Sequence, residues 1–575
     1  MAEQTQRSGE ERAQQGDCED PSHRLAGAAL PGRLRRWLRR LAVGSAALLL
    51  GSAAFLWSCF ATPPPLEGRP AILDAVRIVD ARGRRRVGKS WFLRREGASL
   101  LYLEGDPFSI GYSNARLTAE LFEEQERSLI ETVRRFFPSS LSFWGVATLV
   151  LVNNRSLPDF VPEEYQREIH GLSLGAPDPF PELGPRYHRI LNYHAAHDIS
   201  HWVWDRPVVG CSAFAARGPE TRSGHLLVGR NFDFEAGRHF DRNKIIGLYR
   251  PEQGYSFLSV SWPGMAGAVT GLNERRLYCS INGAHSSDRA RIGEPVSLLV
   301  REVLQYCGTI EEAVERIRRA QVFVSDSYLV ASGETGDAVV VEKTPARAEV
   351  RGFEKGDLLF QTNHFEAPGF LREPGNLEQL REGTTSRRRE RLEELVHAAR
   401  GRLDPPLVAR ILRDRRDVGG GPLALGHRGA LNALIATHSV VCDVTAGILW
   451  VSRGPYPLGR YDAYRIDAFG EEVAPPIPAD PLLASDAPAR LERARALIAA
   501  AREAPEAHVA QLEEALALNP GDPDALRLLG VANARRGRSG RARRLLRAAL
   551  RGRPAFPADR RACEELLARL GGGAE

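Results

Sequence analysis

The chain has 575 residues, of which 43% are hydrophobic, so its length allows several packed units and its composition excludes wholesale disorder. Its 78 basic and 72 acidic residues leave a net charge of +6, and outside the N-terminus the basic residues form no cluster interleaved with aromatic residues. A nucleic-acid partner is therefore not expected. Seven cysteines without CxxC pairs or regular spacing argue against a zinc ribbon or a disulfide framework.

The N-terminal segment predicts a membrane anchor. Residues 1–40 are polar and end in an arginine cluster, which is typical of a disordered cytoplasmic tail. The uncharged run 41–61 is long enough to cross a hydrocarbon core of about 30 Å as a helix. The basic flank places the rest of the chain outside the cytoplasm, in a periplasmic or extracellular space. The alternatives are a cleaved signal, twin-arginine export, or lipid attachment at Cys59 in the imperfect lipobox LWSC.

The middle of the chain predicts an α+β fold with antiparallel sheets. Helical periodicity marks 115–137 and 186–204, and a capping box with Glu312 opens a helix after Thr309. Many strand-like runs form hairpin-like pairs, which favours layered antiparallel sheets over alternating βαβ units. These runs are 226–234, 256–262, 266–270, 277–282, 328–332, 338–342, 358–362, 439–444 and 448–452. Cys279 and Cys442 lie in such runs and are expected in the core.

The end of the chain predicts a helical tail. A proline-rich linker at 474–485 precedes an alanine-, leucine- and arginine-rich segment, 486–575. Within it, an Asn-Pro and an Arg-Pro recur about 34 residues apart, separated by the helix-length stretches 524–536 and 539–551 with a break at Gly537. This pattern resembles a tetratricopeptide repeat and indicates a small helical cap or a docking module for a protein partner. A nondescript helical tail is the alternative.

Cys211 differs from the other cysteines in its surroundings. It follows a glycine and enters a run of small residues, GCSAFAA, and the next strand-like run, GRNFDF, carries Arg230 and Asp233. Two asparagines follow in similar strand contexts, Asn282 in SING and Asn363 in QTNHF. An arginine-rich helix start, SRRRERL, completes the series.

The order GCSAFAA, GRNFDF, GLNERRLYCSINGAH, QTNHF and SRRRERL resembles the acyl-coenzyme A:6-aminopenicillanic acid acyltransferase family. This family is related to choloylglycine hydrolases and acid ceramidases within the N-terminal-nucleophile hydrolase superfamily. Upstream, LEGDPFSIGY resembles the opening of the family's propeptide region, so the resemblance covers about residues 95–460. It implies a four-layer αββα fold and self-cleavage between Gly210 and Cys211, which would divide the chain into a propeptide, 62–210, and a hydrolase core, 211–473.

Self-cleavage would solve a chemical problem for Cys211. A thiol is a weak nucleophile at its free pKa of about 8.5 and needs a base or a shifted pKa. Cleavage would give Cys211 a free α-amino group, with a reference pKa of about 7.7–8.0, which can take the thiol proton and later give it to the leaving amine. Nucleophile and base then reside in one residue, so neither a separate histidine nor a cofactor is expected. Glycine at position 210 would allow the strained backbone that such an attack needs.

The resemblance also implies the roles of the other residues. Asp233 would hold the new ammonium group, Arg230 would favour the thiolate, and Asn282 and Asn363 would contact the tetrahedral intermediate. Arg388, or the adjacent Arg387, would be the distal arginine. Each residue also has a purely structural alternative. Cys211 would be a core thiol, and Arg230 with Asp233 a cross-strand ion pair. The two asparagines would be turn residues, and the arginine run a solvated helix face.

Three other functions compete with this hypothesis. His194, His197 and His201 lie at helical spacing, so a metal-dependent hydrolase is conceivable. A papain-like protease is the second, but the cysteine followed closely by a tryptophan near a helix start, which is usual in such enzymes, is absent from this sequence. An inactive membrane-anchored scaffold with a partner-binding tail is the third. We expect instead an amidohydrolase or acyltransferase that cleaves linear C–N amide bonds of small N-acyl compounds, with hydrolysis and acyl transfer both open.

Overall fold

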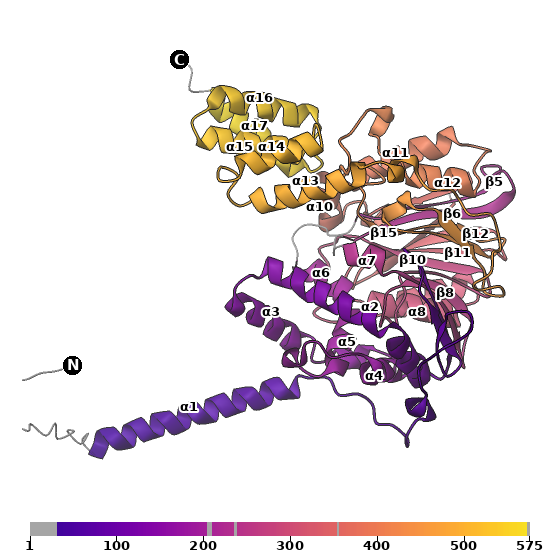
Figure 1. Ribbon diagram of the computed structural model, residues 1–575, viewed down its shortest axis with the longest axis vertical. Helices are drawn as coiled ribbons and strands as arrows, with labels where there is room; N and C mark the ends of the chain where they lie inside the picture. Colours follow the sequence, from indigo (N-terminus) through magenta and orange to yellow (C-terminus); the bar gives the residue numbers. More distant parts are fainter. Residues whose placement is uncertain (1–31, 204–209, 235–237, 354–355, 572–575) are drawn as a thin grey trace, which may run out of the picture. The chain divides into compact units, whose positions relative to one another are not determined.

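The computed structural model describes residues 32–203, 210–234, 238–353 and 356–571, and the chain divides into two compact units, Met1–Ser58 and Cys59–Glu575 (Figure 1). The first unit contains α1 (Gly32–Ser58), in which Arg40–Ser58 is long and apolar enough to cross a membrane. A signal sequence near the N-terminus has the same properties. The helix agrees with the expected apolar run and is equally compatible with the anchor and with the cleaved signal.

The second unit is built on two sheets. In the described part of the chain, the larger sheet has eleven strands and the smaller has six. The larger sheet contains, in spatial order, β1 (Ile78–Val79), β2 (Arg85–Val87), β3 (Ser90–Leu93), β4 (Ser99–Gly105), β7 (Ile245–Pro251), β8 (Phe257–Ser261), β9 (Thr270–Asn273), β10 (Leu277–Gly283), β11 (Asp326–Ser332), β12 (Asp337–Lys343) and β13 (Ala348–Gly352). The smaller contains β14 (Leu358–Gln361), β5 (Ser212–Gly218), β6 (Gly224–Asp233), β15 (Ala436–Asp443), β16 (Ile448–Ser452) and β17 (Tyr461–Tyr464).

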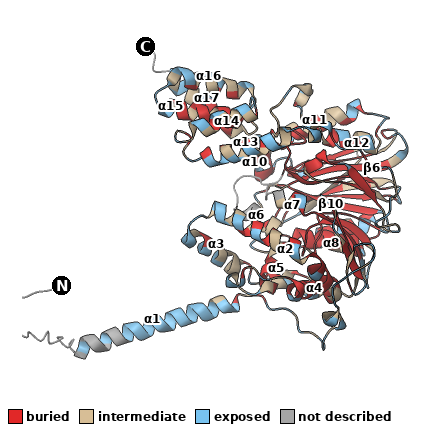
Figure 2. Cartoon of the chain, viewed as in Figure 1, coloured by how far each residue is buried: buried red, intermediate tan, exposed pale blue. Residues whose placement is uncertain are grey.

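Alternation along β5 shows how the small sheet is packed. Ala213 and Ala215 lie in a core with residues of both sheets, among them Leu329 and Val340 of the larger sheet. Phe214 and Ala216 point to the opposite side, into a core that includes residues of α11 (Thr385–Ala398) and α12 (Pro405–Leu412). Because side chains alternate between the two faces of a strand, the small sheet has one face toward the larger sheet and the other toward these helices. The strands of the two sheets consist mainly of buried residues, coloured red in Figure 2.

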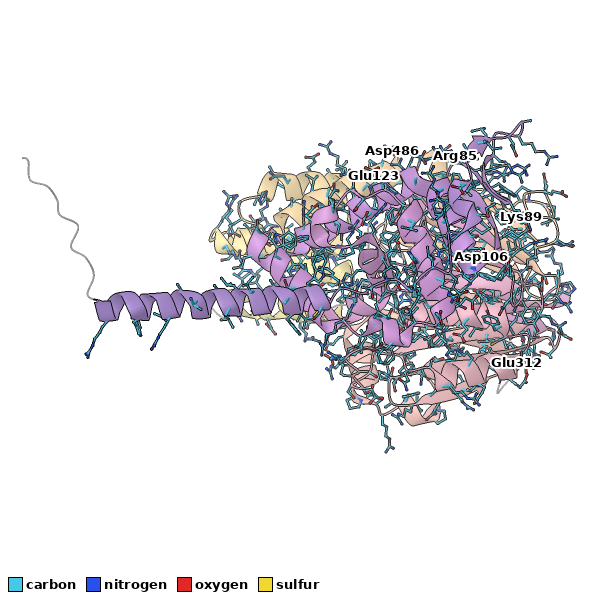
Figure 3. The ribbon with its side chains drawn as sticks, turned by 90° about the horizontal axis from the view of Figure 1, so that it is seen from below. Arg85, Lys89, Asp106, Glu123, Glu312 and Asp486 are labelled. Carbon is cyan, nitrogen blue, oxygen red and sulfur yellow. The ribbon has the colours of Figure 1, made fainter. Side chains whose placement is uncertain are left out.

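Helices from the expected propeptide pack with the larger sheet. One hydrophobic core joins the sheet to α2 (Pro107–Phe136), α4 (Glu163–Gly175) and α5 (Arg186–His194) of that segment, and to α8 (Val296–Tyr306) and α9 (Ile310–Arg319), which follow Cys211 in the chain. Asp106, labelled in Figure 3, caps α2 by accepting a hydrogen bond from the Ser109 amide at 3.1 Å. A Cβ at Gly111 of α2 would lie 1.8 Å from the Glu168 carbonyl oxygen of α4, so glycine allows these two helices to cross in backbone contact.

The remaining helices surround these layers or form the C-terminal tail. The former are α3 (Ser140–Asn153), α6 (Ala196–Val203), α7 (Arg238–Arg242) and α10 (Pro374–Glu382). The tail consists of α13 (Ala487–Ala501), α14 (Val509–Leu518), α15 (Pro523–Arg535), α16 (Ser539–Arg551) and α17 (Pro557–Gly571), drawn in orange to yellow in Figure 1. The two helices expected at 524–536 and 539–551 are present, and Gly537 between them adopts a φ of 72°.

Most sequence expectations for elements are confirmed, and three need correction. The α+β class and the capping box after Thr309 are confirmed. The helix expected at 186–204 is interrupted at Ala195, and its last residue lies outside the described part. Of the strand expected at 266–270 only Thr270 is extended, because the chain leaves a turn at Gly264, whose φ is 72°. The sheets are not wholly antiparallel, since β4 and β7 pair in parallel. In the segment 474–485, expected as a linker, Ile477 is buried and bridged to Tyr461.

Candidate active site

The residues singled out in the sequence meet where strands of both sheets end. Cys211 directly precedes β5, Asp233 ends β6, Asn282 is the penultimate residue of β10, and Asn363 follows β14. Arg388 lies in the first turns of α11. All of these side chains, with that of Arg230 on β6, are buried. The fold therefore brings the six expected residues into one closed site, and strand pairing explains why, since β5 lies between β6 and β14.

The Cys211 thiol is buried and protonated in this intact chain. Burial raises the pKa of Cys211 to about 11, against the opposing influence of the Arg230 and Arg388 guanidiniums and with a further increase from Asp233. The thiol donates to the Asp233 carbonyl oxygen at 3.9 Å, and the Gly210 amide donates to the same oxygen at 3.3 Å. At this pKa the thiol needs a base before it can attack a carbonyl group.

Arg388 connects Cys211 to Asn363. Its Nη1 donates to the carbonyl oxygen of Cys211 at 2.5 Å and to Ser212 Oγ at 2.9 Å, and its Nη2 donates to Asn363 Oδ1 at 2.7 Å. The adjacent Arg387 points elsewhere, with its Nη2 2.6 Å from Asp417 Oδ2. The geometry thus places Arg388, and not Arg387, among the site residues.

Arg230 makes the corresponding connection to Asn282. Its Nε donates to Asn282 Oδ1 at 3.3 Å, and its two other nitrogens donate to Thr270 Oγ1 and to the Ile281 carbonyl oxygen. The Asn282 amide nitrogen lies 3.4 Å and 3.3 Å from the carbonyl oxygens of Gln361 and Thr362. These are long hydrogen bonds, so this amide can exchange them for a stronger acceptor.

The close neighbours of the Gly210–Cys211 bond include an arginine that the sequence did not single out. A Cβ placed on Gly210 would lie 3.3 Å from Asp233 Oδ2 and 3.4 Å from Arg428 Nη1. Gly210 is not among the residues with positive φ. Its backbone therefore lies outside the left-handed region, and a side chain at this position would lie close to two charged groups.

Sequence reasoning missed several residues around the site. Thr270 and the buried His438 both contact Arg230, with His438 Nε2 2.8 Å from Thr270 Oγ1. Burial and the nearby Arg230 lower the pKa of His438 well below its ordinary value, so this imidazole is neutral. Neither these residues nor Arg428 carries a sequence signal, because they come from a strand end, an apolar strand and a loop without periodicity.

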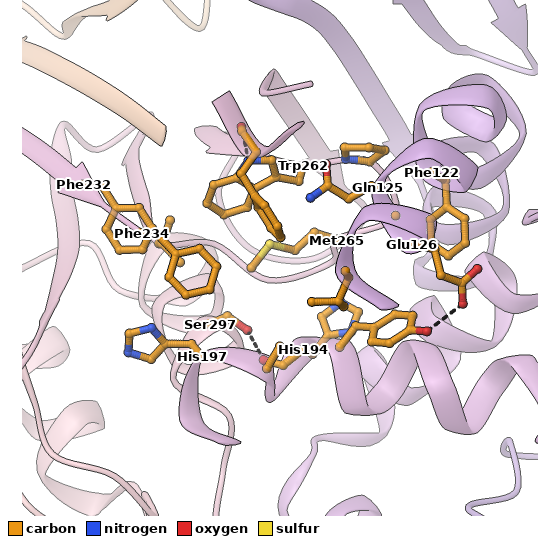
Figure 4. Close-up of a pocket in the computed structure, with 17 residues that line it drawn as sticks. Phe122, Gln125, Glu126, His194, His197, Phe232, Phe234, Trp262, Met265 and Ser297 are labelled. Atoms are coloured by element: carbon orange, nitrogen blue, oxygen red, sulfur yellow. Dashed lines mark hydrogen bonds between the residues drawn. The ribbon is translucent and has the colours of Figure 1, made fainter. Parts of the chain in front are cut away.

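An apolar pocket, drawn with its lining residues in Figure 4, is connected to the site. Phe232 connects the two, because its ring lines the pocket while the Arg230 guanidinium carbon lies 4.7 Å from the ring centroid. The pocket walls come from both sides of Gly210. Phe122 and His197 precede it, whereas Phe234 and Trp262 follow it. Its lining is mainly aromatic and aliphatic, which suits an apolar group.

The three histidines considered as metal ligands have different surroundings. His194 Nδ1 donates to the Ile190 carbonyl at 2.8 Å and its Nε2 accepts from the Ala266 amide at 2.8 Å, which leaves no ring nitrogen for a metal. His197 Nε2 lies 3.1 Å from Asp326 Oδ1. The side chain of His201 lies outside the described residues. Within the described ranges, no group of three or more His, Cys, Asp or Glu side chains could hold a metal ion.

Comparison with known proteins agrees with the family resemblance. The model of the acyl-coenzyme A:6-aminopenicillanic acid acyl-transferase family matches residues 220–428. An uncharacterized protein of Archaeoglobus fulgidus is 26% identical over 306 residues, 47% of this chain and 51% of that protein. The N-acylethanolamine-hydrolyzing acid amidase of Caenorhabditis elegans is 22% identical over 227 residues, 37% of this chain and 59% of that protein. The chain thus spans about half the length of the curated relatives it matches.

A solved structure of a variant conjugated bile acid hydrolase from Clostridium perfringens is also similar. It shares 16% identity, covers 45% of this chain and 93% of its own, and has a TM-score of 0.33. The resemblance predicted from the sequence is confirmed by the family match, which includes Arg230, Asp233, Asn282, Asn363 and Arg388. Cys211 lies just before the matched region.

Proposed function

We propose that the chain is a self-cleaving N-terminal-nucleophile hydrolase or acyltransferase that cuts linear amide bonds of small N-acyl compounds through a thioester on Cys211. The observation that carries the proposal is the convergence of Cys211, Arg230, Asp233, Asn282, Asn363 and Arg388 in one buried site at the ends of strands. The family match over residues 220–428 supports it independently. In this proposal the two sheets and the helices on their outer faces form a four-layer αββα arrangement.

Self-cleavage uses the same thiol as the later reaction. Cys211 Sγ attacks the carbonyl carbon of Gly210 while the thiol proton passes to the Cys211 nitrogen, which leaves as an amine. The product is a thioester between Gly210 and Cys211. Water then hydrolyses it, giving the Gly210 carboxylate, a free thiol and a free α-amino group. A Cβ built on Gly210 would lie 3.3 Å from the Asp233 carboxylate and 3.4 Å from Arg428, so charged groups close to the bond proposed to break support this step.

The mature site then acts on an external amide. The α-amine takes the Cys211 proton, and the thiolate attacks the substrate carbonyl carbon. The Asn282 amide donates to the resulting oxyanion, and Arg230 holds the Asn282 side chain by its oxygen. The ammonium, held by Asp233, protonates the leaving amine. Water, or an acceptor amine, then attacks the thioester and releases the acyl group. Arg388 keeps Cys211 and Asn363 in register throughout.

The pocket indicates the substrate class. Its apolar lining and its contact with the site through Phe232 favour an apolar acyl group on the carbonyl side of the amide. The name of the Caenorhabditis elegans relative describes hydrolysis of N-acylethanolamines, which are amides of this kind. Acyl amines and N-acyl amino acids with hydrophobic acyl chains are therefore the first compounds to test.

Localisation and the ends of the chain complete the proposal. The apolar helix within Arg40–Ser58 and the arginines before it support a membrane anchor with the hydrolase outside the cytoplasm. A secreted or lipid-anchored form after signal cleavage is the alternative. In this proposal the helical tail is a tetratricopeptide-like module that binds a protein partner.

The test is turnover of N-acyl amides by purified protein. Release of the free acid and the amine should be followed for a series of acyl chain lengths, with Cys211→Ser as the matched variant. The proposal predicts release by the wild type, faster for apolar acyl chains, and at least a 10²-fold loss in the variant. Equal rates for the two proteins would remove Cys211 from the mechanism.

A further inference from the structure

The C-terminal tail contacts the hydrolase core mainly through one long loop, residues 413–435, between α12 and β15. Arg495 of α13 donates to three backbone carbonyls of this loop, those of Leu434 at 2.8 Å, Ala433 at 2.7 Å and Gly426 at 3.1 Å. Asn519, which follows α14, donates to the Leu425 carbonyl at 3.0 Å. Because a loop this long has little secondary structure of its own, its conformation depends on such contacts together with those from the core, such as Arg391 Nε to Asp414 Oδ2 at 2.9 Å.

A second set of contacts is centred on Arg553, between α16 and α17. Its backbone carbonyl accepts a hydrogen bond from His427 Nε2 at 2.7 Å. His427 Nδ1 accepts from the Gly429 amide at 3.0 Å, so the two partners fix the tautomer in which Nε2 carries the proton. Arg553 has a φ of 57°, unusual for a residue with a side chain, and its tail-to-core contacts hold this conformation.

The Arg553 side chain reaches a buried carboxylate that also pairs with an arginine of the core. It binds Asp417 Oδ2, which also accepts a hydrogen bond from Arg387 Nη2 at 2.6 Å. Although burial opposes ionisation, the hydrogen bonds from these two arginines lower the pKa of Asp417 to about 2. Arg387 is adjacent to Arg388 on α11, so this ion pair joins the tail to the helix that contacts Cys211.

The residue between His427 and Gly429 is Arg428. Its Nη1 approaches Gly210, at the bond expected to be cut, next to the Asp233 carboxylate. The tail therefore contacts the loop at His427, directly before Arg428, and again at Ala433 and Leu434 beyond it.

We infer that Arg428 is a further functional residue of the site, and that the C-terminal helices act within the same chain to hold it there. The inference rests on the function proposed above. After cleavage, the new α-amino group of Cys211 would face Asp233 from β6, Arg230 from β6, Arg388 from α11 and Arg428 from the loop. A nearby positive charge disfavours protonation of an amine. Arg428 thereby keeps this amine available as a base, while Asp233 holds it in place.

The experiment compares four full-length variants. Arg428→Ala removes the positive charge and Arg428→Lys keeps it. Arg495→Ala removes three hydrogen bonds from the tail to the loop. Arg493→Ala is the matched control, because Arg493 lies on the same helix and pairs with Glu514 of the tail at 2.7 Å. Each protein is tested for appearance of the fragment beginning at Cys211, for its thermal midpoint, and for the pH dependence of kcat/KM on an N-acyl amide.

Since activity needs the unprotonated amine, it rises with pH through the amine pKa. Arg428→Ala should move this acidic limb to higher pH by about 1 unit, and Arg495→Ala should move it in the same direction by less. Arg428→Lys and Arg493→Ala should keep the wild-type limb. A loss of folding alone would lower the amplitude and the thermal midpoint without moving the limb.

An unmoved limb in Arg428→Ala would overturn the role of Arg428, and an unmoved limb in Arg495→Ala alone would overturn the role of the tail. If Arg428→Ala is too unstable to measure, a shifted limb in Arg495→Ala but not in Arg493→Ala supports the inference, and an unmoved limb in Arg495→Ala overturns it. A wild-type chain that neither matures nor turns over amides would instead contradict the proposed function itself.

Discussion

Arg388 donates a hydrogen bond at 2.5 Å to the carbonyl oxygen of Cys211, 177 residues before it in the chain. This contact joins the first turns of α11 to the start of β5, and a second bond from the same guanidinium reaches Asn363 after β14. Three segments distant in sequence are thus held by one buried cation. The position of Cys211 relative to the strand ends depends on it.

Substitution of Arg388 should impair both maturation and turnover. Arg388→Lys keeps the charge but cannot bridge the carbonyl of Cys211 and the side chain of Asn363 at once, because an ammonium lacks the planar fork of a guanidinium. We expect kcat to fall by about 10²-fold, since each hydrogen bond to a charged group contributes roughly 1.5–3 kcal/mol. Arg389→Ala on the same helix is the control, because Arg389 pairs with Glu366 and Glu393. Equal losses in the two variants would contradict a specific role for Arg388.

Substitution of Asn282 should lower kcat more than it changes KM. Loss of one oxyanion donor costs roughly 10²–10³ in kcat in comparable sites. Asn282→Ala is therefore expected to lower kcat by about that factor at nearly constant KM. Asn273 on the neighbouring strand β9 gives the contrast, because it bonds the carbonyls of Leu304 and Cys307, remote from Cys211. Asn273→Ala should lower the thermal midpoint and leave kcat near the wild-type value. A normal kcat in Asn282→Ala would remove this residue from oxyanion binding.

Residue 210 should affect maturation and not the mature enzyme. A Cβ on Gly210 fits tightly, 3.3 Å from Asp233 Oδ2 and 3.4 Å from Arg428 Nη1, and a larger side chain would displace both. Gly210→Val should slow self-cleavage by roughly 10-fold or more and Gly210→Ala by less. Once cut, both should turn over substrate at the wild-type rate, because residue 210 supplies no group to the mechanism and is no longer bonded to Cys211. Gly145→Ala, where nothing lies within 4 Å of an added Cβ, is the control.

A buried carboxyl group in the expected propeptide should make the uncut chain less stable at higher pH. Burial, reinforced by the nearby Asp326, raises the pKa of Asp198 from 3.8 to about 8, against the opposing influence of His197. In the unfolded chain this group ionises near its ordinary pKa, whereas the folded chain retains the proton. Between about pH 4 and 8, unfolding therefore releases a proton, and the free energy of unfolding falls as pH rises.

The measurement is denaturant unfolding of Cys211→Ala, which keeps the chain whole, with and without Asp198→Asn. The double variant should be more stable by a few kcal/mol, on the order of the pKa shift, near pH 8 and should gain little near pH 4. The exposed Asp159→Asn provides the matched charge change. A stability difference between the two proteins that does not depend on pH would exclude this titration.

The sequence singled out residues that the fold brings together, but it did not predict their surroundings, for physical reasons. The six site residues could be predicted because the proposed chemistry requires particular residue types, and because most of them lie in or next to strands that the sequence pattern marks. The choice between Arg387 and Arg388 required three dimensions, since adjacent helical residues point about 100° apart and only packing decides which one faces the strands. Arg428 and the contacts between the tail and its loop could not be predicted, because an irregular loop has no hydrophobic periodicity.

Element boundaries failed where tertiary contacts override local patterns. Residues Ala266–Val269 are as apolar as a strand, yet only Thr270 extends the sheet, and Ala266 instead donates its amide to His194. The parallel pairing of β4 with β7 joins segments on either side of the expected cleavage point, which no local signal could reveal. Cys279 and Cys442 were expected in the core, and both are fully buried.

The central claim is tested most directly by the intact mass of the purified protein beside Cys211→Ala. The chain of 575 residues has a mass of 63.4 kDa. Cleavage before Cys211 should divide it into fragments of about 23 and 40 kDa, the larger beginning with Cys211, and the variant should remain whole. A folded wild-type chain that stays at full mass would contradict the account, because the α-amino base on which the mechanism depends would never form.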